Sequence, residues 1–226
     1  MTQLYIANKN YSSWSLRPWV LMRMLDIPFK ERLMPFGGDA DAFRAFSPTG
    51  KVPCLVSAGV AVWDSLAITE YLAERHPGVW PREVLARTWA RCATAEMHSG
   101  FGMLRERCTF NCGIRVDLGP VPPALQSDLD RLDTLWREGL KKFGGPFLAG
   151  SDFCAADAFF APVAFRIQTY RLNLSEPALA YAARLRGLAP MREWEAAALA
   201  ETWRDEPHEA EARAAGTWVE DLRAVG

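Results

Sequence analysis

The sequence predicts an α/β domain followed by an all-helical domain, and three observations support this division. A chain of 226 residues, half of them hydrophobic, is long enough to bury a sizeable core and to divide in two. Short apolar runs alternate with helical patterns at the start, whereas nearly everything after residue 83 has helical periodicity. Between these regions, residues 76–81 carry two prolines and a glycine. We therefore assign residues 1–77 to the first domain, 78–84 to a linker and 85–226 to the second domain.

The first domain opens with a strand, a helix and a second strand. Residues 4–7 form a short apolar run suited to a buried strand, and residues 28–34 predict the second strand. Between them, apolar side chains recur at helical spacing from Ser15 onward. Pro18 is tolerated only in the first turn of a helix, so we expect this helix to begin within about one turn of Ser15. Two strands joined by a helix form a parallel crossover unit.

A hairpin and a helix complete the first domain. After a glycine-containing loop and a short helix over 40–46, apolar runs at 51–56 and 60–63 predict the two strands of the hairpin. The stretch 64–74 begins with Asp and Ser, which are favoured at helix starts, and continues with apolar residues at helical spacing. Strand, helix, strand, hairpin and helix in this order form a thioredoxin-like layout.

The turn between the first strand and the first helix, residues 10–18, has the properties of an anion site. The N–H groups of a helix's first turn lack partners within the helix and carry the positive end of its dipole. A thiolate would be stabilised here, but Ser12, Ser13, Trp14 and Ser15 occupy the place where a Cys-x-x-Cys redox motif would stand. A sulfur atom at this turn must therefore come from a bound ligand.

The proline at position 53 leaves two alternatives open. A cis Val52–Pro53 bond would turn the Val52 backbone outward, so that its N–H and C=O could pair with a peptide-like ligand as an added strand. An ordinary trans proline at the start of a strand fits the local sequence equally well.

The second domain is predicted to be a helical bundle around a central apolar helix. Proline- and glycine-containing breaks at 121–123 and 144–146 separate the helical patterns. The charged tail, residues 205–226, is expected to be only partly ordered. The predicted helices cover residues 83–111, 124–143, 155–171, 177–187 and 190–202.

Composition and motifs exclude several classes of function. A formal net charge of −1, with both signs interspersed, leaves no field that would attract nucleic acid or anionic lipid. The N-terminus lacks a signal-peptide pattern and no run of about 18 apolar residues could cross a membrane, so we expect a cytoplasmic protein. The five cysteines are then free thiols, and the three histidines lack partners at metal-ligand spacing, so no metal site is expected. The nucleotide-binding and nucleophile-elbow motifs are absent.

Four separate features resemble the cytosolic glutathione transferases over most of the chain. Residues 12–17 are similar to the Ser-Ser-Cys-x-x-Arg turn of the zeta class, with Trp14 in place of the cysteine. Val52–Pro53 matches the family's cis-proline strand, and Asp64–Ser65 resembles its Glu/Gln–Ser pair. Residues 148–157 resemble the Leu-x-Gly…Ser/Thr-x-x-Asp segment that leads into the central helix, with a cysteine at the Ser/Thr position. The resemblance implies the glutathione transferase fold, a thioredoxin-like domain followed by a helical bundle.

The resemblance also implies a chemical role for the serine turn. Ser12 would donate a hydrogen bond to the glutathione sulfur, with Ser13 and Ser15 as alternatives. Lowering the pKa of a thiol by about two units from about 8.5 requires roughly 2.7 kcal/mol, which one hydroxyl and a helix N-terminus can supply. The serine would stabilise the thiolate and would not itself be the nucleophile. The alternative is that Ser12 merely caps the helix.

The other glutathione contacts implied by the resemblance lie in two segments. Asp64 would bind the α-amino group of the ligand, although its side chain is shorter than the usual Glu or Gln. Ser65 would bind the α-carboxylate at a helix N-terminus, which favours an anion. Lys51 could reach the glycine carboxylate, beside the strand edge formed by Val52 and Pro53.

The second substrate is implied to lie between the domains, opposite the serine turn. His98, Phe101 and Arg105 are three and four residues apart, so on one helix they would share a face. A histidine and an arginine are costly to bury among apolar neighbours without partners. Together with Trp14 these residues are the candidate contacts for the electrophile, and simple packing is the alternative. With Trp14 at the cysteine position, the isomerase specificity of the zeta class does not carry over on this motif.

The sequence therefore predicts a glutathione transferase that conjugates glutathione to a small electrophile, as in detoxification. A glutathione-dependent isomerase or peroxidase would use the same first site. A binding or stress protein that keeps the fold without turnover is a third alternative. The family also implies a homodimer, with glutathione as co-substrate and no metal.

Overall fold

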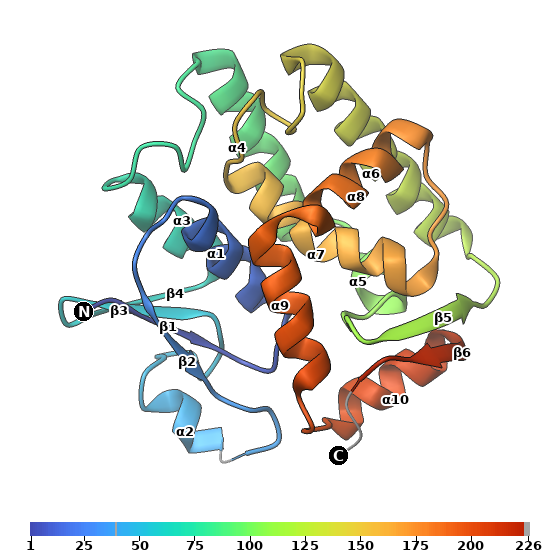
Figure 1. The fold of residues 1–226 in the computed structure, drawn as a ribbon, viewed down its shortest axis with the longest axis horizontal. Coiled ribbons are helices and arrows are strands. Elements are labelled where there is room, and N and C mark those ends of the chain that lie inside the picture. Colours follow the sequence, from blue (N-terminus) through green and yellow to red (C-terminus); the bar gives the residue numbers. More distant parts are fainter. Residues whose placement is uncertain (39, 224–226) are drawn as a thin grey trace.

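A four-stranded sheet organises the N-terminal part of the computed structural model, which describes residues 1–38 and 40–223 (Figure 1). The strand order is β2-β1-β3-β4, with β1 and β2 parallel and the other neighbouring pairs antiparallel. The predicted thioredoxin-like fold is confirmed. Its elements are β1 (Gln3–Ile6), α1 (Ser13–Met24), β2 (Lys30–Leu33), α2 (Ala40–Arg44), β3 (Cys54–Ser57), β4 (Val60–Trp63) and α3 (Ser65–Ala73).

Helix α1 lies between the sheet and the helical part of the molecule. It packs against β1 and α3 on one side and against the central helix α7 (Ala155–Tyr170) on the other, so Leu16, Trp19 and Val20 are fully buried. The helix begins at Ser13, within one turn of Ser15 as predicted. Pro18 therefore stands in the second turn, and the expectation that it stands in the first was wrong.

Helix α7 forms the centre of the C-terminal part. All of its residues except Gln168 are buried, and it contacts α1, α4 and α8. At its start, the Asp157 carboxylate accepts hydrogen bonds from the N–H groups of Leu148 and Cys154 and from the Tyr181 hydroxyl. The remaining elements are α4 (Val84–Ser99), α5 (Gly102–Arg107), β5 (Ile114–Leu118), α6 (Pro123–Phe143), α8 (Glu176–Gly187), α9 (Ala189–Ala200), α10 (Glu206–Ala215) and β6 (Gly216–Asp221).

The prediction of one long helix over residues 83–111 was wrong. The helix stops at Ser99, because Gly100 is extended and Phe101 has a left-handed backbone with φ of 53°. A Cβ at Gly100 would lie 2.8 Å from a backbone oxygen of Glu96, so this break requires glycine. The chain resumes as the short helix α5 and then passes into β5.

The C-terminal part is also not purely helical, and the described part of the tail, residues 205–223, forms a helix and a strand where partial order was expected. Strands β5 and β6 pair antiparallel, and α10 packs beside them (Figure 1). The charges of the tail are used within the fold, because Arg223 is paired with Glu209 and Asp221. The last part of the predicted tail and second domain, residues 224–226, lies outside the described residues.

The Val52–Pro53 peptide bond is cis, which decides between the two alternatives that the sequence left open. No hydrogen bond to the Val52 backbone occurs in the described part of the chain, so its N–H and C=O are free. Gly145–Pro146 is also cis, which the sequence did not predict.

Candidate functional site

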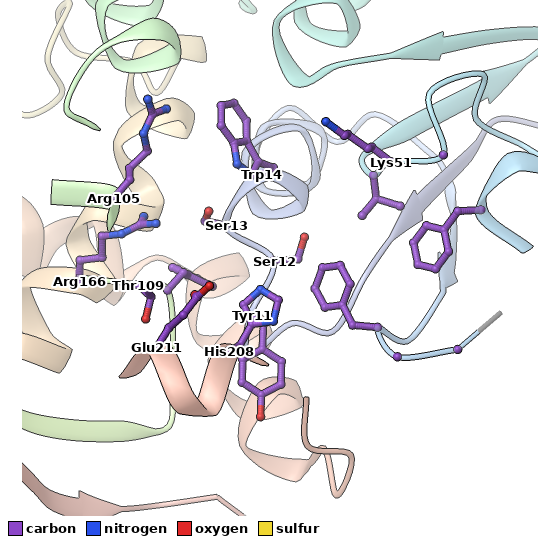
Figure 2. Close-up of a pocket in the computed structure, with 17 residues that line it drawn as sticks. Tyr11, Ser12, Ser13, Trp14, Lys51, Arg105, Thr109, Arg166, His208 and Glu211 are labelled. Carbon is purple, nitrogen blue, oxygen red and sulfur yellow. The ribbon is translucent and has the colours of Figure 1, made fainter. Parts of the chain in front are cut away.

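A cavity of about 560 Å³ lies at the N-terminus of α1, where the thioredoxin-like part meets the helical part (Figure 2). One wall is the serine turn, and another comes from α5, the segment after it and α7. The third is provided by α10 of the C-terminal tail. The cavity therefore combines residues that are up to about 200 positions apart along the chain.

Ser12 stands at the N-cap position of α1 and lines the cavity. Its side chain makes no capping hydrogen bond, so the N–H groups of the first turn are left uncapped. Its hydroxyl donates instead to the Ser15 Oγ at 2.7 Å, and that oxygen is also 3.3 Å from the Ala7 N–H. Ser15 is fully buried and does not line the cavity. Helix capping alone thus does not explain why a serine stands at position 12, and the hydrogen bond to Ser15 holds its hydroxyl in place.

Two neighbours of Ser12 also face the cavity. Ser13 lines it, and no hydrogen bond to its hydroxyl occurs in residues 1–38 and 40–223. Tyr11 contributes its ring, whereas its hydroxyl donates to the Glu209 carboxylate at 2.6 Å. Burial, followed by the hydrogen bond to Glu209, raises the pKa of Tyr11 to about 12. This phenol is therefore occupied and is not available to a thiol.

A second pocket of about 480 Å³ adjoins the cavity and shares Trp14, Lys51 and Val52 with it. The structure brings all five residues expected to bind glutathione into this one pocket. They are Lys51, Val52, Pro53, Asp64 and Ser65.

The junction of β4 and α3 supplies two polar residues of this pocket, Asp64 and Ser65. Asp64 has φ of 75°, a strained value for a residue with a side chain, and its Oδ1 caps α3 by accepting from the Leu66 N–H at 2.7 Å. Its Oδ2 is 3.5 Å from Nε2 of His98. Ser65 is fully buried, and its hydroxyl has no partner among the described residues. An unpaired buried hydroxyl is costly unless a ligand completes its hydrogen bonding.

The predicted residues of the second-substrate site divide into two groups. Arg105 lines the cavity, and its guanidinium lies 5.5 Å from the centre of the Trp14 ring, which also lines it. His98 and Phe101 do not line this cavity, and their contact with a second substrate stays a prediction. The break at Gly100 leaves His98 on α4, whereas Phe101 is the N-cap of α5, the helix that carries Arg105, so the three residues do not share one helix face. His98 instead packs edge-on against Trp14 and faces Asp64.

Two further arginines stand beside Arg105, and sequence reasoning missed them as site residues. Arg166, on α7, lines the cavity, is 4% exposed and donates through Nε to the Cys108 carbonyl at 2.7 Å. Arg17 is 1% exposed, and its Nε and Nη1 have no partner in the described part of the chain. A charged residue within an apolar central helix was the available signal for Arg166.

Arg105 and Arg166 line the cavity as a cationic wall, and Arg17 lies beside them against the Trp14 ring. No ion pair joins Arg17, Arg105 or Arg166 to an acidic side chain within the described residues. Burial, and next the charges of Arg166 and Arg105, lower the pKa of Arg17, while burial lowers the pKa of Arg166 to about 10. Keeping unpaired cations away from water is costly, so this wall favours a bound anion.

The wall formed by α10 was also missed, because the tail was expected to be partly disordered. His208 and Glu211 of this helix line the cavity together with Phe36 and Phe43 from the other side. Their positions depend on contacts between the two ends of the chain, for which the local sequence holds no signal.

Searches for metal and membrane features add two observations. No group of three or more His, Cys, Asp or Glu side chains that could hold a metal ion occurs in residues 1–38 and 40–223. No helix of this part of the chain is both long enough and apolar enough to cross a bilayer.

Comparisons with known proteins point to one family. The sequence-family model of the glutathione S-transferase N-terminal domain matches residues 11–75 of this chain. A probable maleylacetoacetate isomerase of Caenorhabditis elegans is 26% identical over 76% of this chain and 81% of its own. Maleylacetoacetate isomerase of Rattus norvegicus is 24% identical over the same shares of the two chains.

Solved structures show the same fold. A glutathione transferase homologue from Burkholderia, crystallised with bound glutathione, matches 85% of this chain and 95% of its own with a TM-score of 0.66 and 23% identity. A theta class glutathione S-transferase from Xanthomonas axonopodis pv. citri, also with glutathione bound, matches the same shares with a TM-score of 0.63 and 21% identity.

Proposed function

Because the chain belongs to the cytosolic glutathione transferase family, we propose that it binds glutathione in the smaller pocket, with the sulfur at the serine turn. The thiolate then attacks a small electrophile held in the cavity. One observation carries this proposal. The five residues that the family resemblance assigns to glutathione line a single pocket, and that pocket shares three residues with the cavity of Ser12.

The glutathione pocket offers a partner for each charged end of the tripeptide. The Ser65 hydroxyl, buried and unpaired at the start of α3, suits the α-carboxylate, and the Asp64 carboxylate suits the α-amino group. The free Val52 N–H and C=O suit the peptide backbone as an added strand. Lys51 is exposed at the other end, where it suits the glycine carboxylate.

The sulfur is proposed to lie at Ser12, where the uncapped first turn of α1 meets the cavity. A thiolate there receives the positive end of the helix dipole. The Ser12 hydroxyl now donates to Ser15, and turning it toward the ligand would give the sulfur a hydrogen bond. Ser13, whose hydroxyl faces the cavity without a partner, is the alternative donor.

A second candidate function is glutathione-dependent isomerisation of an anionic substrate. The cationic wall of Arg105 and Arg166, with Arg17 beside it, favours a carboxylate-bearing electrophile, because none of the three forms an ion pair with an acidic side chain within the described residues. Two relatives are named maleylacetoacetate isomerases, which agrees with this candidate. Peroxidase activity and ligand binding without turnover remain further alternatives for the same first site.

Calorimetry with glutathione, followed by assays of conjugation, isomerisation and peroxide reduction, tests these proposals. We expect glutathione to bind and a carboxylate-bearing electrophile to react faster than a neutral one of similar size. Binding without any turnover would favour a non-catalytic binding protein. No measurable binding of glutathione would refute all of these functions.

Ser12→Ala tests the position of the sulfur. Because removing a single donor to a developing anion commonly costs about 10²-fold in rate, we expect turnover to fall by one to two orders of magnitude. Glutathione affinity should change little, because the carboxylate and amino contacts lie in the other pocket. Unchanged turnover in this variant and a loss in Ser13→Ala would move the role to Ser13.

We also propose that the protein is a cytoplasmic homodimer, as its family implies. Five free cysteines, four of them buried, fit a reducing compartment. Light scattering of the purified protein would test the dimer, and a monomer at micromolar concentration would contradict it.

A further inference from the structure

The cavity contains a histidine that the proposed function does not use. His208 lies in the first turn of α10 and lines the cavity together with Ser12 (Figure 2). The next residue, Glu209, accepts a hydrogen bond from the hydroxyl of Tyr11, which directly precedes Ser12. Tyr11 is next to Ser12 in the sequence and Glu209 is next to His208, so this hydrogen bond holds His208 close to the serine turn.

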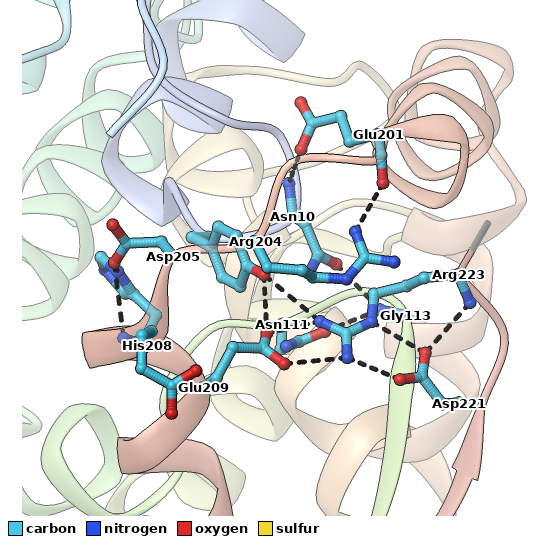
Figure 3. A network of polar contacts seen from close by, with 12 residues as sticks. Asn10, Asn111, Gly113, Glu201, Arg204, Asp205, His208, Glu209, Asp221 and Arg223 are labelled. Atoms are coloured by element: carbon cyan, nitrogen blue, oxygen red, sulfur yellow. Dashed lines mark hydrogen bonds and ion pairs between the residues drawn. The ribbon is translucent and has the colours of Figure 1, made fainter. Parts of the chain in front are cut away.

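A polar network anchors α10 in this position (Figure 3). Arg223 pairs with Glu209 and with Asp221, and its own side chain is 2% exposed. At the other end of the segment, the Glu201 carboxylate accepts from the N–H of Lys9 at 2.7 Å. The C-terminal segment is thus hydrogen-bonded to residues at and just before the serine turn. Breaking a buried ion pair such as that of Arg223 with Glu209 is costly in free energy.

The His208 ring is held in one orientation. Its two stacking partners are Phe36, with ring centres 5.0 Å apart, and Tyr11, with ring centres 5.2 Å apart. Its Nδ1 contacts the carboxylate of Asp205, which is 7% exposed. No contact to Nε2 occurs in residues 1–38 and 40–223, and the side chain is 31% exposed. The ring therefore has Nε2 as its only free polar atom.

A helix cap explains only part of this arrangement. Asp205 is the N-cap of α10 and also accepts from the His208 N–H at 3.4 Å. Capping alone requires neither a ring contact to Asp205 nor an imidazole stacked beside the cavity. A carboxylate that accepts from Nδ1–H fixes the tautomer with its lone pair on Nε2.

The other cavity groups are poor proton acceptors. The Tyr11 hydroxyl is bonded to Glu209, a serine hydroxyl is too weak a base near neutral pH, and the arginines are cations. Glu211 is the one other carboxylate lining the cavity within the described residues, and it is exposed to solvent. His208 is therefore the best-placed base for a thiol at the serine turn.

We propose that His208, oriented by Asp205, accepts the thiol proton of glutathione bound at Ser12. This inference rests on the proposed function. The S–H bond breaks, its proton moves to Nε2 and its electron pair stays on sulfur, which then forms the C–S bond. When the electrophile undergoes addition, the imidazolium returns the proton to the carbanion that the attack creates. When it undergoes substitution, the leaving group departs with its electron pair and the proton passes to water.

Chemical rescue of His208→Ala tests this role. We expect kcat to fall by about 10²-fold, because a positioned base contributes at least that much, while the Kd for glutathione stays within about threefold. Added imidazole should restore turnover in proportion to its concentration, since the variant opens a space between Phe36 and Tyr11. His76→Ala, on a histidine outside the cavity, is the matched control and should lose less than about threefold.

Asp205→Asn provides a second variant that keeps a capping side chain, so α10 should still form. We expect kcat to fall by about tenfold, because an amide, which can also donate to Nδ1, no longer fixes the tautomer that leaves Nε2 free to accept a proton. Unchanged kcat in His208→Ala, or a loss that imidazole fails to rescue while glutathione still binds, would overturn the inference and leave the proposed function intact. Failure of the unaltered protein to bind glutathione would overturn both.

Discussion

The two pockets at the serine turn differ in how they are built. The pocket proposed to bind glutathione takes the five predicted residues from two short contiguous segments, Lys51 to Pro53 and Asp64 to Ser65. The cavity beside it combines the serine turn with charged residues of α5, α7 and α10, which come together only in the folded chain. The first pocket is local in sequence, whereas the second is assembled by tertiary packing.

Because the two pockets are built from different parts of the chain, we expect them to respond to different substitutions. Changes to the helical part and the tail should alter the reaction of the electrophile and spare glutathione affinity. Changes at the start of α3 should do the reverse. Such a separation lets the second site vary while the first stays the same.

Removing the anchor of α10 should have the largest effect. Glu209→Ala leaves Arg223 buried without its main partner, at a cost of about 3 kcal/mol in the free energy of unfolding. Hydrogen exchange should show α10 and β6 opening first, while the Kd for glutathione changes by less than about threefold. Glu206→Ala, whose ion pair with Arg213 is exposed, is the matched control and should cost less than about 0.5 kcal/mol. Equal protection of α10 in the two variants would contradict the anchoring role.

Arg166→Met should have the next largest effect, and only on the second substrate. Loss of a charged hydrogen-bond donor worth about 1.5–3 kcal/mol should lower kcat/KM for a carboxylate-bearing electrophile by about 10- to 100-fold. A neutral electrophile should lose less than about threefold. Arg171→Met, at the exposed end of the same helix, is the control. Equal losses for charged and neutral electrophiles would show that Arg166 only supports the fold.

Ser65→Ala should affect the other pocket. Because the buried hydroxyl has no protein partner, its loss should leave the free energy of unfolding unchanged or slightly higher. We expect the Kd for glutathione to rise by about tenfold, equivalent to about 1.4 kcal/mol, with kcat nearly unchanged. Calorimetry beside Ser151→Ala, an exposed serine outside this pocket, measures the difference. An unchanged Kd would remove Ser65 from the glutathione site.

Lowering the pH should destabilise α10 and β6, which form one side of the cavity and its support, before it affects the rest of the fold. Burial favours the neutral form of Glu209, but the hydrogen bonds from Arg223 and Tyr11 outweigh it and hold the pKa of this carboxyl below its usual range. The hydrogen bond from Arg223 likewise lowers the pKa of Asp221. Both groups stabilise the fold at pH values above about 4, and this stability is lost as the pH falls through their lowered pKa values. Hydrogen exchange measured at pH 7 and below pH 4 should show that the amides of α10 and β6 lose protection before those of the other elements. A uniform loss of protection across the chain would contradict this.

The thioredoxin-like part was the more predictable half because its signals are local. Apolar runs and the Asp–Ser start of α3 fixed its elements within a few residues, apart from the turn in which Pro18 lies. The break after Ser99 was missed because apolar spacing continues across it, and only the backbone of Gly100 and Phe101 reveals the change of direction. The tail was misjudged because its many charges suggested solvent, whereas Arg223 and Glu209 neutralise each other within the fold.

The sequence by itself determined the fold class and located the serine turn and the two short segments proposed to bind glutathione, because these depend on neighbours within a few positions of one another. Only the tertiary structure decided which groups face the second substrate. Arg166 reaches the cavity because α7 packs against α1, and His208 reaches it because Glu209 bonds to Tyr11 across nearly the whole chain. Contacts between distant residues arise from the packing of complete elements, and periodicity along the chain carries no record of them.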